Sequence, residues 1–458
     1  MILTILAFIA VLGITITIHE FGHFAMAKLL KIRVLVFSIG FGPKLVGFTR
    51  GGTEYRVSPI PVGGYVKMAG EAFGEERQGA PDEFLSHPKW HRFLVAVAGP
   101  VMNILLAIFI VSFAYLEGMQ IPRYLKGPAV VGPVAADSIA QRAGLRSGDR
   151  IISVHGTLIS TWEDMEITLA TAPKDGLELV AGRGPERIAL KLEPPATGQV
   201  TPFALGIKFT LPATVVSLVS PDSPARKAGL MPGDEILSVK GNGRSAESYD
   251  DILNLISASK GIPLTFELWR PNEAKQGEPL DPAQTRPPGK RIELRIVPEE
   301  AEGRVVIGFT PKIPSDLEKF GVLGAIRESA RHNYQLAALT FRIVGRIFTG
   351  SASVKTISGP LEIARISGDA ARTGSVRVFL SFLALISLQL GVFNLLPIPI
   401  LDGGVIALLV VESLIRRDLS MALKEKIVQV GFVFLILLMG FAVINDLSKV
   451  VALDRFFR

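Results

Sequence analysis

The amino-acid sequence predicts a multi-pass α-helical membrane protein with four transmembrane segments and two α+β domains in tandem outside the membrane. Three observations support this fold class. The 458 residues are 48% hydrophobic with a mean hydropathy of +0.40, which is too apolar for an ordinary soluble protein. Four stretches lack charge over roughly the 20 residues needed to cross a bilayer. A segment in the middle of the chain also repeats, once from Ser138 and once from Ser223.

The uncharged stretches define the expected membrane-spanning segments. They are Met1–Ile18, Phe93–Leu116, Val378–Leu401 and Ile427–Asn445. The first stretch lacks the basic start and the small-residue cleavage site of a signal peptide, so we expect it to be retained. The corresponding transmembrane segments are predicted within residues 1–30, 93–116, 377–415 and 425–448.

Charge predicts the orientation of these segments. Basic residues crowd the Lys31–Arg92 and Arg416–Lys426 loops, which the positive-inside rule places in the cytoplasm. Both termini and the long middle segment then lie outside the cytoplasm. The formal charge is +7, but the sequence has no basic stripe interleaved with aromatic residues, so we expect no nucleic-acid partner. The chain has no cysteine, which excludes disulfides and thiolate metal sites.

The first cytoplasmic loop, residues 31–92, is rich in glycine and β-forming residues. Lys44–Phe48 and Thr53–Val57 could pair as a hairpin across Thr49–Gly52. Backbone that is not helical is tolerated at membrane depth only where it is buried in protein or lines a wet cavity. We therefore expect a membrane-reentrant β-hairpin beside a site in the membrane.

The middle of the chain carries the repeat. SIAQRAGLRSGDRIISVHG starts at Ser138 and SPARKAGLMPGDEILSVKG starts at Ser223. Each copy predicts a short helix, a glycine turn, an aspartate-led turn, an apolar strand and then a longer helix. The domains are predicted at residues 120–206 and 207–312. Residues 313–376 are predicted to form an amphipathic helix on the membrane surface and a linker.

The chemistry of the chain is concentrated where the first apolar run ends. His19 and His23 are four residues apart and share a helix face, with Glu20 next to His19. H-E-x-x-H on a helix is a zinc signature of metalloproteases, in which the glutamate is the general base. Ionisable residues in a membrane segment cost free energy, so their presence indicates a functional site. The alternative is a helix end whose polar side chains reach interfacial water.

A catalytic zinc site needs a third protein ligand. Asp402 is the candidate, because it is an acid between two apolar segments, with Pro397 and Pro399 breaking the helix before it. The alternative is that Asp402 caps the N-terminus of the next helix.

Several motifs together resemble one family, the site-2 protease family of intramembrane zinc metalloproteases. They are HEFGHF, GFGP, PVGGYVKM, AGPVMN and NLLPIPILDGG, and they occur in the family's order along essentially the whole chain. The repeated AGLxxGDxIxSVxG resembles PDZ domains, which bind extended peptides at a sheet edge. The two domains are equally well interpreted as spacers or gates that bind no free peptide.

The resemblance implies roles for individual residues. His19, His23 and Asp402 would bind Zn²⁺, and Glu20 would be the catalytic base. Gly42–Met68 would form the family's reentrant hairpin, and Asn103 occupies the second-span motif position. The residues implied in substrate binding are Asn394, Pro397, Pro399, Val46, Gly47 and Phe48.

The resemblance also implies a biological context. Substrates would be single-span membrane proteins, such as an anti-sigma factor, and remnant signal peptides, cleaved within the bilayer. An upstream site-1-type protease would first trim the ectodomain. The location would be the bacterial cytoplasmic (inner) membrane, with a role in stress response and the PDZ-like domains outside the cytoplasm. The rival interpretations are a surface-cleaving membrane zincin, a non-catalytic PDZ membrane scaffold and a zinc transporter.

Overall fold

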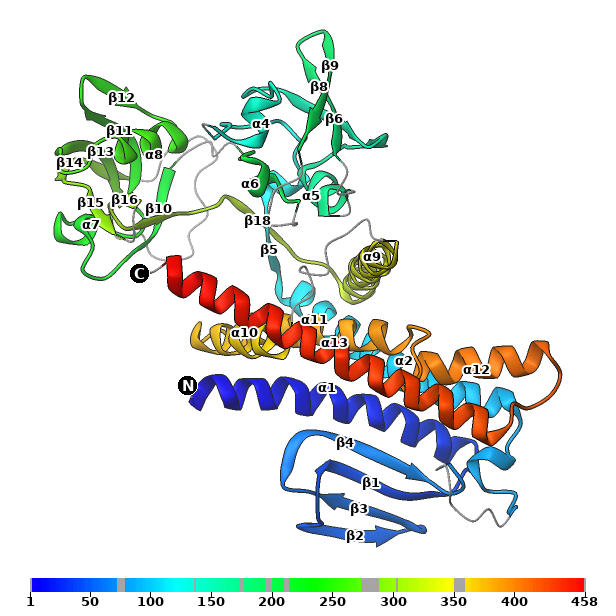
Figure 1. The fold of residues 1–458 in the computed structure, drawn as a ribbon. Helices are drawn as coiled ribbons and strands as arrows, with labels where there is room; N and C mark the ends of the chain where they lie inside the picture. Colours follow the sequence, from blue (N-terminus) through cyan, green and yellow to red (C-terminus); the bar gives the residue numbers. More distant parts are fainter. Residues whose placement is uncertain are drawn as a thin grey trace. The chain divides into compact units, whose positions relative to one another are not determined.

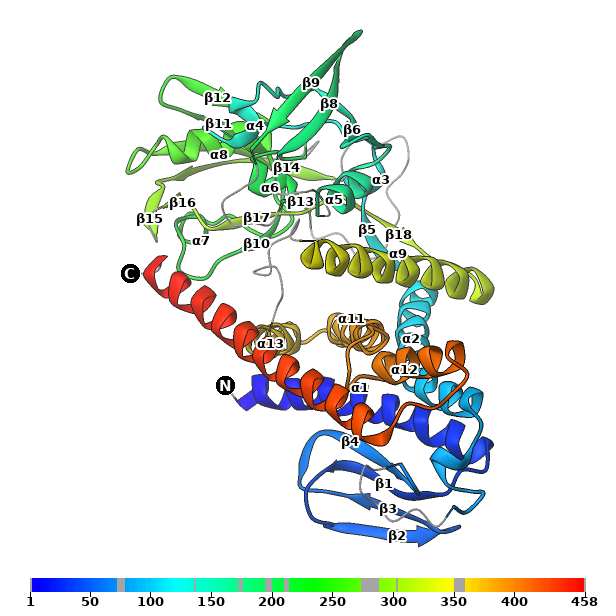
Figure 2. The ribbon, with the colours of Figure 1, turned by 45° about the vertical axis from the view of Figure 1, so that its right-hand side comes forward.

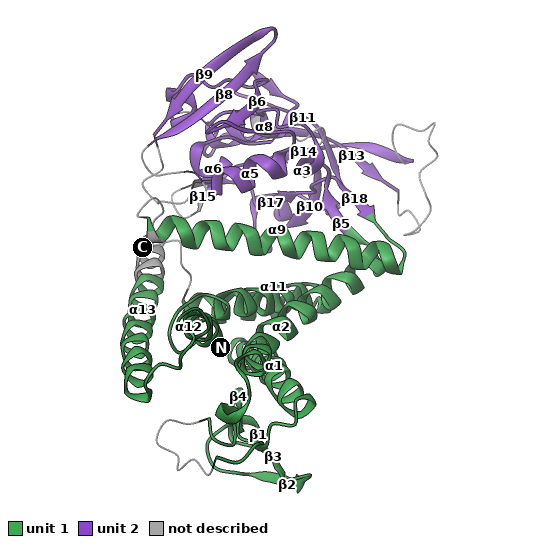
Figure 3. Cartoon of the chain, turned by 90° about the vertical axis from the view of Figure 1, so that its right-hand side faces the viewer, with its two compact units in different colours: residues 1–119, 318–451 green, residues 120–317, 452–458 purple. Residues whose placement is uncertain are grey.

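The computed structural model describes residues 2–71, 79–135, 137–170, 172, 176–193, 200–209, 214–272, 288–301, 304–349 and 359–456. The chain forms two compact units, which are coloured separately in Figure 3. Unit 1 combines residues 1–119 and 318–451, and unit 2 combines residues 120–317 and 452–458. Part of the linker predicted within residues 313–376, namely residues 350–358, lies outside the described residues.

Unit 1 is built mainly from helices (Figure 1). They are α1 (Ile2–Leu29), α2 (Lys89–Glu117), α9 (Val322–Phe348), α10 (Pro360–Arg372), α11 (Val376–Asn394), α12 (Asp402–Leu414) and α13 (Met421–Phe456). Within the described residues, four helices are long and apolar enough to cross a membrane: α1, α2, α11 and α13. The four long apolar helices expected from the sequence are therefore present.

Helix α2 is the centre of unit 1, because α1, α9, α11 and α12 all pack against it. Small residues allow these helices to approach closely, as is common in membrane proteins. A Cβ atom on Gly22 of α1 would collide with the Ala98 carbonyl of α2. A Cβ atom on Gly391 of α11 would lie 2.9 Å from the Pro100 carbonyl oxygen. The helix α9 adds a hydrogen bond of 2.8 Å from Ser329 Oγ to the Ile108 carbonyl.

A β-sheet lies along α1 in unit 1 (Figure 2). Its strands are β1 (Val34–Phe41), β2 (Val46–Arg50), β3 (Thr53–Val57) and β4 (Ile60–Met68), in the order β2–β3–β1–β4. The β2–β3 pairing expected across Thr49–Gly52 is present, with β2 ending two residues later than predicted. Strand β4 makes the main contact of the sheet with α1, and β2 is the opposite edge.

Unit 2 contains both copies of the repeat, each with its own hydrophobic core. The first copy comprises α4 (Ile139–Arg142), β6 (Arg150–Val154), β7 (Thr157–Leu158), α5 (Trp162–Ala170), β8 (Leu177–Arg183), β9 (Glu186–Leu192) and α6 (Pro202–Leu205). The second comprises β10 (Thr214–Val219), α7 (Pro224–Lys227), β11 (Glu235–Gly241), β12 (Arg244–Ala246), α8 (Tyr249–Ser257), β13 (Leu264–Pro271), β14 (Gly289–Ile296), β15 (Glu299–Ala301), β16 (Arg304–Val306) and β17 (Phe309–Pro311). Flanking them are β5 (Met119–Pro122), α3 (Arg123–Lys126) and β18 (Ser315–Glu318), and β18 pairs with β5.

The order of helix, glycine turn, strand and helix predicted from the repeat is present in both copies. In the first, α4 is followed by Gly144 with a φ of +90°, then β6 and α5. In the second, α7 is followed by Gly229 with a φ of +88°, then β11 and α8. The sheets have the orders β7–β6–β8–β9 and β14–β13–β11–β10–β17, and β12 pairs with β11.

Each copy contains a buried ion pair that the sequence did not reveal. Asp149 accepts hydrogen bonds of 2.8 and 2.7 Å from Arg183, and Asp234 accepts two of 2.7 Å from Arg270. Both aspartate side chains are 1% exposed. The same arginines also donate to the carbonyls of Gly144 and Gly229. The aspartate-led turn is thereby tied to the distant strands β8 and β13.

Arg183→Leu should destabilise the first copy, because it leaves the Asp149 carboxylate, which is 1% exposed, without its charge partner. The hydrogen bonds from Arg183 lower the pKa of Asp149 below its usual range. The ion pair therefore stabilises the folded state at pH values above the pKa that Asp149 has in the unfolded chain. This contribution is lost as the pH falls through the lower pKa that Asp149 has in the folded chain. In the full-length Arg183→Leu variant at neutral pH, amide hydrogen exchange should be faster than in wild type for peptides of the first copy.

The second copy is the internal control for this prediction, and Arg270→Leu should reverse the pattern. Equal exchange in wild type and Arg183→Leu would show that the pair contributes nothing to stability.

Candidate metal centre

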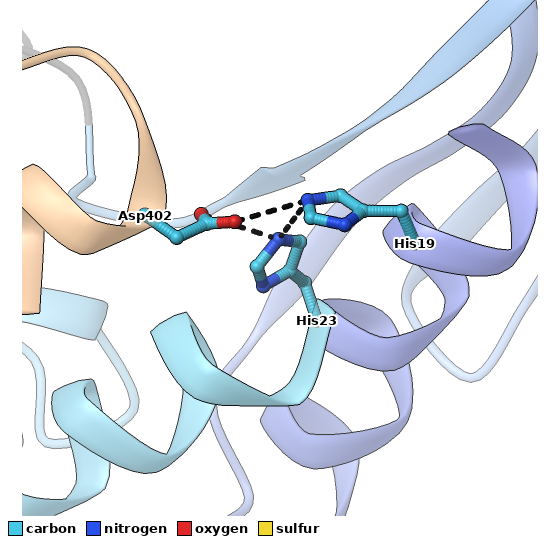
Figure 4. Close-up of side chains that lie close together, drawn as sticks. All are labelled: His19, His23 and Asp402. Atoms are coloured by element: carbon cyan, nitrogen blue, oxygen red, sulfur yellow. Dashed lines mark hydrogen bonds and ion pairs between the residues drawn. The ribbon is translucent and has the colours of Figure 1, made fainter. Parts of the chain in front are cut away.

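Three predicted ligands from two distant segments of unit 1 lie close together (Figure 4). His19 and His23 lie on one face of α1, buried, with their Nε2 atoms 3.1 Å apart. Asp402 comes from the start of α12. Its Oδ2 lies 3.0 Å from His19 Nε2 and its Oδ1 lies 3.4 Å from His23 Nε2. In the described part of the chain, these side chains form a group whose ligand atoms all lie within 4.8 Å of one another.

The segment between α11 and α12 places Asp402. Leu401 is the N-cap residue of α12, and Asp402 is the first residue of the helix. The alternative in which Asp402 caps this helix is therefore wrong, since its carboxylate faces the histidines. The preceding residue Ile400 has a φ of +85°. Such a backbone is strained for a β-branched residue, and strain of this kind is typical of functional sites.

Gly403 and Gly404 follow Asp402 and are buried in the first turn of α12. A Cβ atom on either residue would collide with the backbone of the Leu395–Pro399 segment. They therefore let α12 start close against the end of α11.

Helix α2 orients both imidazole rings. His23 Nδ1 lies 2.8 Å from the Val95 carbonyl, which can only accept, so Nδ1 carries the proton and Nε2 presents a lone pair. His19 Nδ1 lies 3.2 Å from the side-chain amide of Asn103. Gly99 makes room for both rings, because a Cβ atom there would collide with His23 Nε2 and lie 2.9 Å from His19 Cε1.

The donor set fits a tetrahedral divalent cation. Zn–N bonds of 2.0–2.1 Å at tetrahedral angles place two ligand nitrogens about 3.3 Å apart, and here the Nε2 atoms are 3.1 Å apart. Asp402 Oδ2 is buried and lies 3.0 Å from His19 Nε2, and among the described residues it has no contact with the geometry of a hydrogen bond. Two imidazoles and a carboxylate leave a fourth position open, which is the arrangement of catalytic rather than structural zinc sites.

This group lines a cavity of about 560 Å³, and two further predicted residues line the same cavity. Glu20 lines it, and its Oε2 accepts a hydrogen bond of 3.1 Å from the Val66 amide of β4. Asn394, at the end of α11, lines it as well. The predicted site residues that are not among its described lining residues are Pro397, Pro399, Val46, Gly47 and Phe48.

The remaining cavity lining includes charged residues that were not predicted from the sequence. Glu412, whose side chain is 1% exposed, forms an ion pair with Lys424 of α13, with 2.6 Å between Glu412 Oε1 and Lys424 Nζ. Arg92 of α2 is also buried in this wall. The Glu412–Lys424 pair connects α12 and α13 beside the cavity.

Comparison with known proteins identifies related chains. The model of peptidase family M50 matches residues 7–438. A putative zinc metalloprotease of Neisseria meningitidis is 32% identical over 97% of this chain and 99% of its own length. The regulator of sigma-E protease RseP of Escherichia coli and the protease RseP of Yersinia pestis are each 33% identical over 97% of this chain and 98% of their own lengths.

Proposed function

The chain belongs to peptidase family M50, the site-2 protease family, and on this basis we propose that it is a zinc metalloprotease that cleaves single-span membrane proteins within the bilayer. The observation that carries this proposal is the convergence of His19, His23 and Asp402 next to Glu20 in a helix that is apolar enough to span a membrane. A substrate buried in lipid requires a catalytic site at the same depth.

His19, His23 and Asp402 would hold the zinc ion. When bound, zinc supplies polarisation of the scissile carbonyl and a water of lowered pKa. Glu20 takes the proton from the attacking water and delivers it to the leaving amine nitrogen as the C–N bond breaks. The Val66 amide holds one carboxylate oxygen of Glu20, so the other oxygen remains available for this proton.

The substrate must unwind before it reacts, because a transmembrane helix satisfies its peptide groups internally. The Asn394 side chain, in the cavity wall, can hydrogen-bond to the exposed peptide groups. Strand β4 is an edge strand that lines the same cavity, so the unwound segment can pair with it as an added strand. Val46 and Phe48, 65% and 62% exposed on β2 beside Gly47, suit contact with lipid and with the helical substrate before it unwinds. Pro397 and Pro399 act indirectly, by shaping the segment that presents Asp402.

The remaining features support a role in regulated intramembrane proteolysis. We propose that the two copies of the repeat, at 120–206 and 207–312, are PDZ-like domains outside the cytoplasm that exclude large ectodomains. Substrates would be an anti-sigma factor and remnant signal peptides, trimmed first by a site-1-type protease, in the bacterial inner membrane. The sigma-E regulators among the relatives support this context.

Cleavage of a single-span substrate in nanodiscs tests the proposal. Mass spectrometry should locate the cut within the span when the ectodomain has been trimmed. A zinc chelator should abolish the cut, and an untrimmed ectodomain should slow it. A cut confined to loops would favour a surface-cleaving zincin, and zinc binding without any cut would favour a scaffold or a transporter.

A further inference from the structure

Asn103 is the buried side chain that joins three helices at the metal centre. It is 0% exposed on α2, and its side-chain amide lies 3.2 Å from His19 Nδ1 on α1. Ser387 Oγ of α11 lies 2.9 Å from the Asn103 carbonyl and 3.5 Å from Asn103 Oδ1. The amide is therefore held between a histidine and a hydroxyl.

The orientation of this amide determines which nitrogen of His19 is free. With Nδ2 facing the ring, Asn103 donates to His19 Nδ1, so the ring proton sits on Nε2 and no lone pair faces Asp402. A metal bound through Nε2 requires the proton on Nδ1, and that proton then needs an acceptor. Turning the amide by about 180° supplies Oδ1 as the acceptor, because its oxygen and nitrogen ends have the same shape.

The turned amide also satisfies its other neighbour. Nδ2 then points toward Ser387 Oγ, which accepts from it and keeps its own hydrogen for the Asn103 carbonyl. In this arrangement Ser387, Asn103 and His19 each have a hydrogen-bond partner. Each amide orientation thus matches one tautomer of His19, without any movement of the helices.

We propose that Asn103 is the positioning residue for His19: its Oδ1 accepts from Nδ1–H and thereby presents the Nε2 lone pair to the metal. This inference rests on the proposed zinc site. It distinguishes the two histidines, because His23 is oriented by the Val95 backbone carbonyl, which no substitution removes. His19 depends on a side chain, so this contact can be tested by mutation.

Zinc affinity of the full chain in detergent, measured by competition with a chromogenic chelator, tests the proposal. Asn103→Leu keeps the side-chain size but removes the acceptor, and should weaken zinc binding by about 10–100-fold. Asn103→Asp keeps an acceptor and should retain affinity within a few-fold. Asn333→Leu is the matched control, since Asn333 is a buried asparagine of α9 that bonds the Ser329 carbonyl. It should bind zinc like wild type.

The outcomes separate positioning from packing. Wild-type affinity in Asn103→Leu, or an equal loss in Asn103→Asp, would overturn the inference. If Asn103→Leu does not fold, Ser387→Ala decides. It removes the acceptor of the turned amide and should weaken zinc binding several-fold, and unchanged affinity would overturn the proposal. A wild-type chain that binds no zinc would overturn the metal assignment itself, which is a distinguishable failure.

Discussion

Replacing Glu20 with glutamine should reduce substrate cleavage by about 10²–10⁴-fold while zinc binding stays unchanged. Glutamine has the same shape and still offers an oxygen to the Val66 amide, which now binds Glu20 Oε2 at 3.1 Å. It cannot accept the proton of the attacking water. The loss should appear in the single-turnover rate rather than in substrate affinity, because the carboxylate is needed for the chemical step.

Zinc content measured on the same preparation makes this prediction specific. Glu425→Gln, at an exposed position of α13, is the matched control and should cleave like wild type. Loss of zinc in Glu20→Gln would mean that Glu20 is a ligand, and unchanged cleavage would mean that another group is the base.

The proximity of His19, His23 and Asp402 could be predicted from the sequence because each residue carries a local signal. The spacing of His19 and His23 is the helical repeat, and three ionisable groups after an apolar run need a compensating partner. Asp402 stands out for the same reason, as an acid between apolar segments. The local pattern could not decide where the carboxylate points. An acid at the start of α12 is compatible both with capping that helix and with facing α1.

The supporting contacts could not be predicted because they depend on which elements become neighbours. The Val66 amide meets Glu20 only because β4, and not β2, is the sheet edge beside α1. The hairpin β2–β3 was visible as a local pattern, and Val46 and Phe48 lie on β2, at the opposite edge of the sheet from β4. Arg183 was missed for a similar reason, since no short-range signal links it to Asp149.

Gly99→Ala should weaken zinc binding at least about 100-fold without changing any ligand, because metal sites tolerate shifts of only about 0.2 Å. The added Cβ atom would collide with His23 Nε2, lie 2.6 Å from His23 Cε1 and lie 2.9 Å from His19 Cε1. Both rings would have to move. At an open position in a helix, glycine to alanine stabilises by about 0.5–1 kcal/mol.

Gly440→Ala is that open case, since a Cβ atom on Gly440 of α13 meets nothing within 4 Å. It should keep zinc affinity and raise the melting temperature in detergent, whereas Gly99→Ala should lose zinc and gain no stability. Wild-type zinc affinity in Gly99→Ala would show that the rings can turn aside and that α2 does not set their position. The opposite result would make α2, which supplies no ligand, as necessary for the metal as the histidines that it orients.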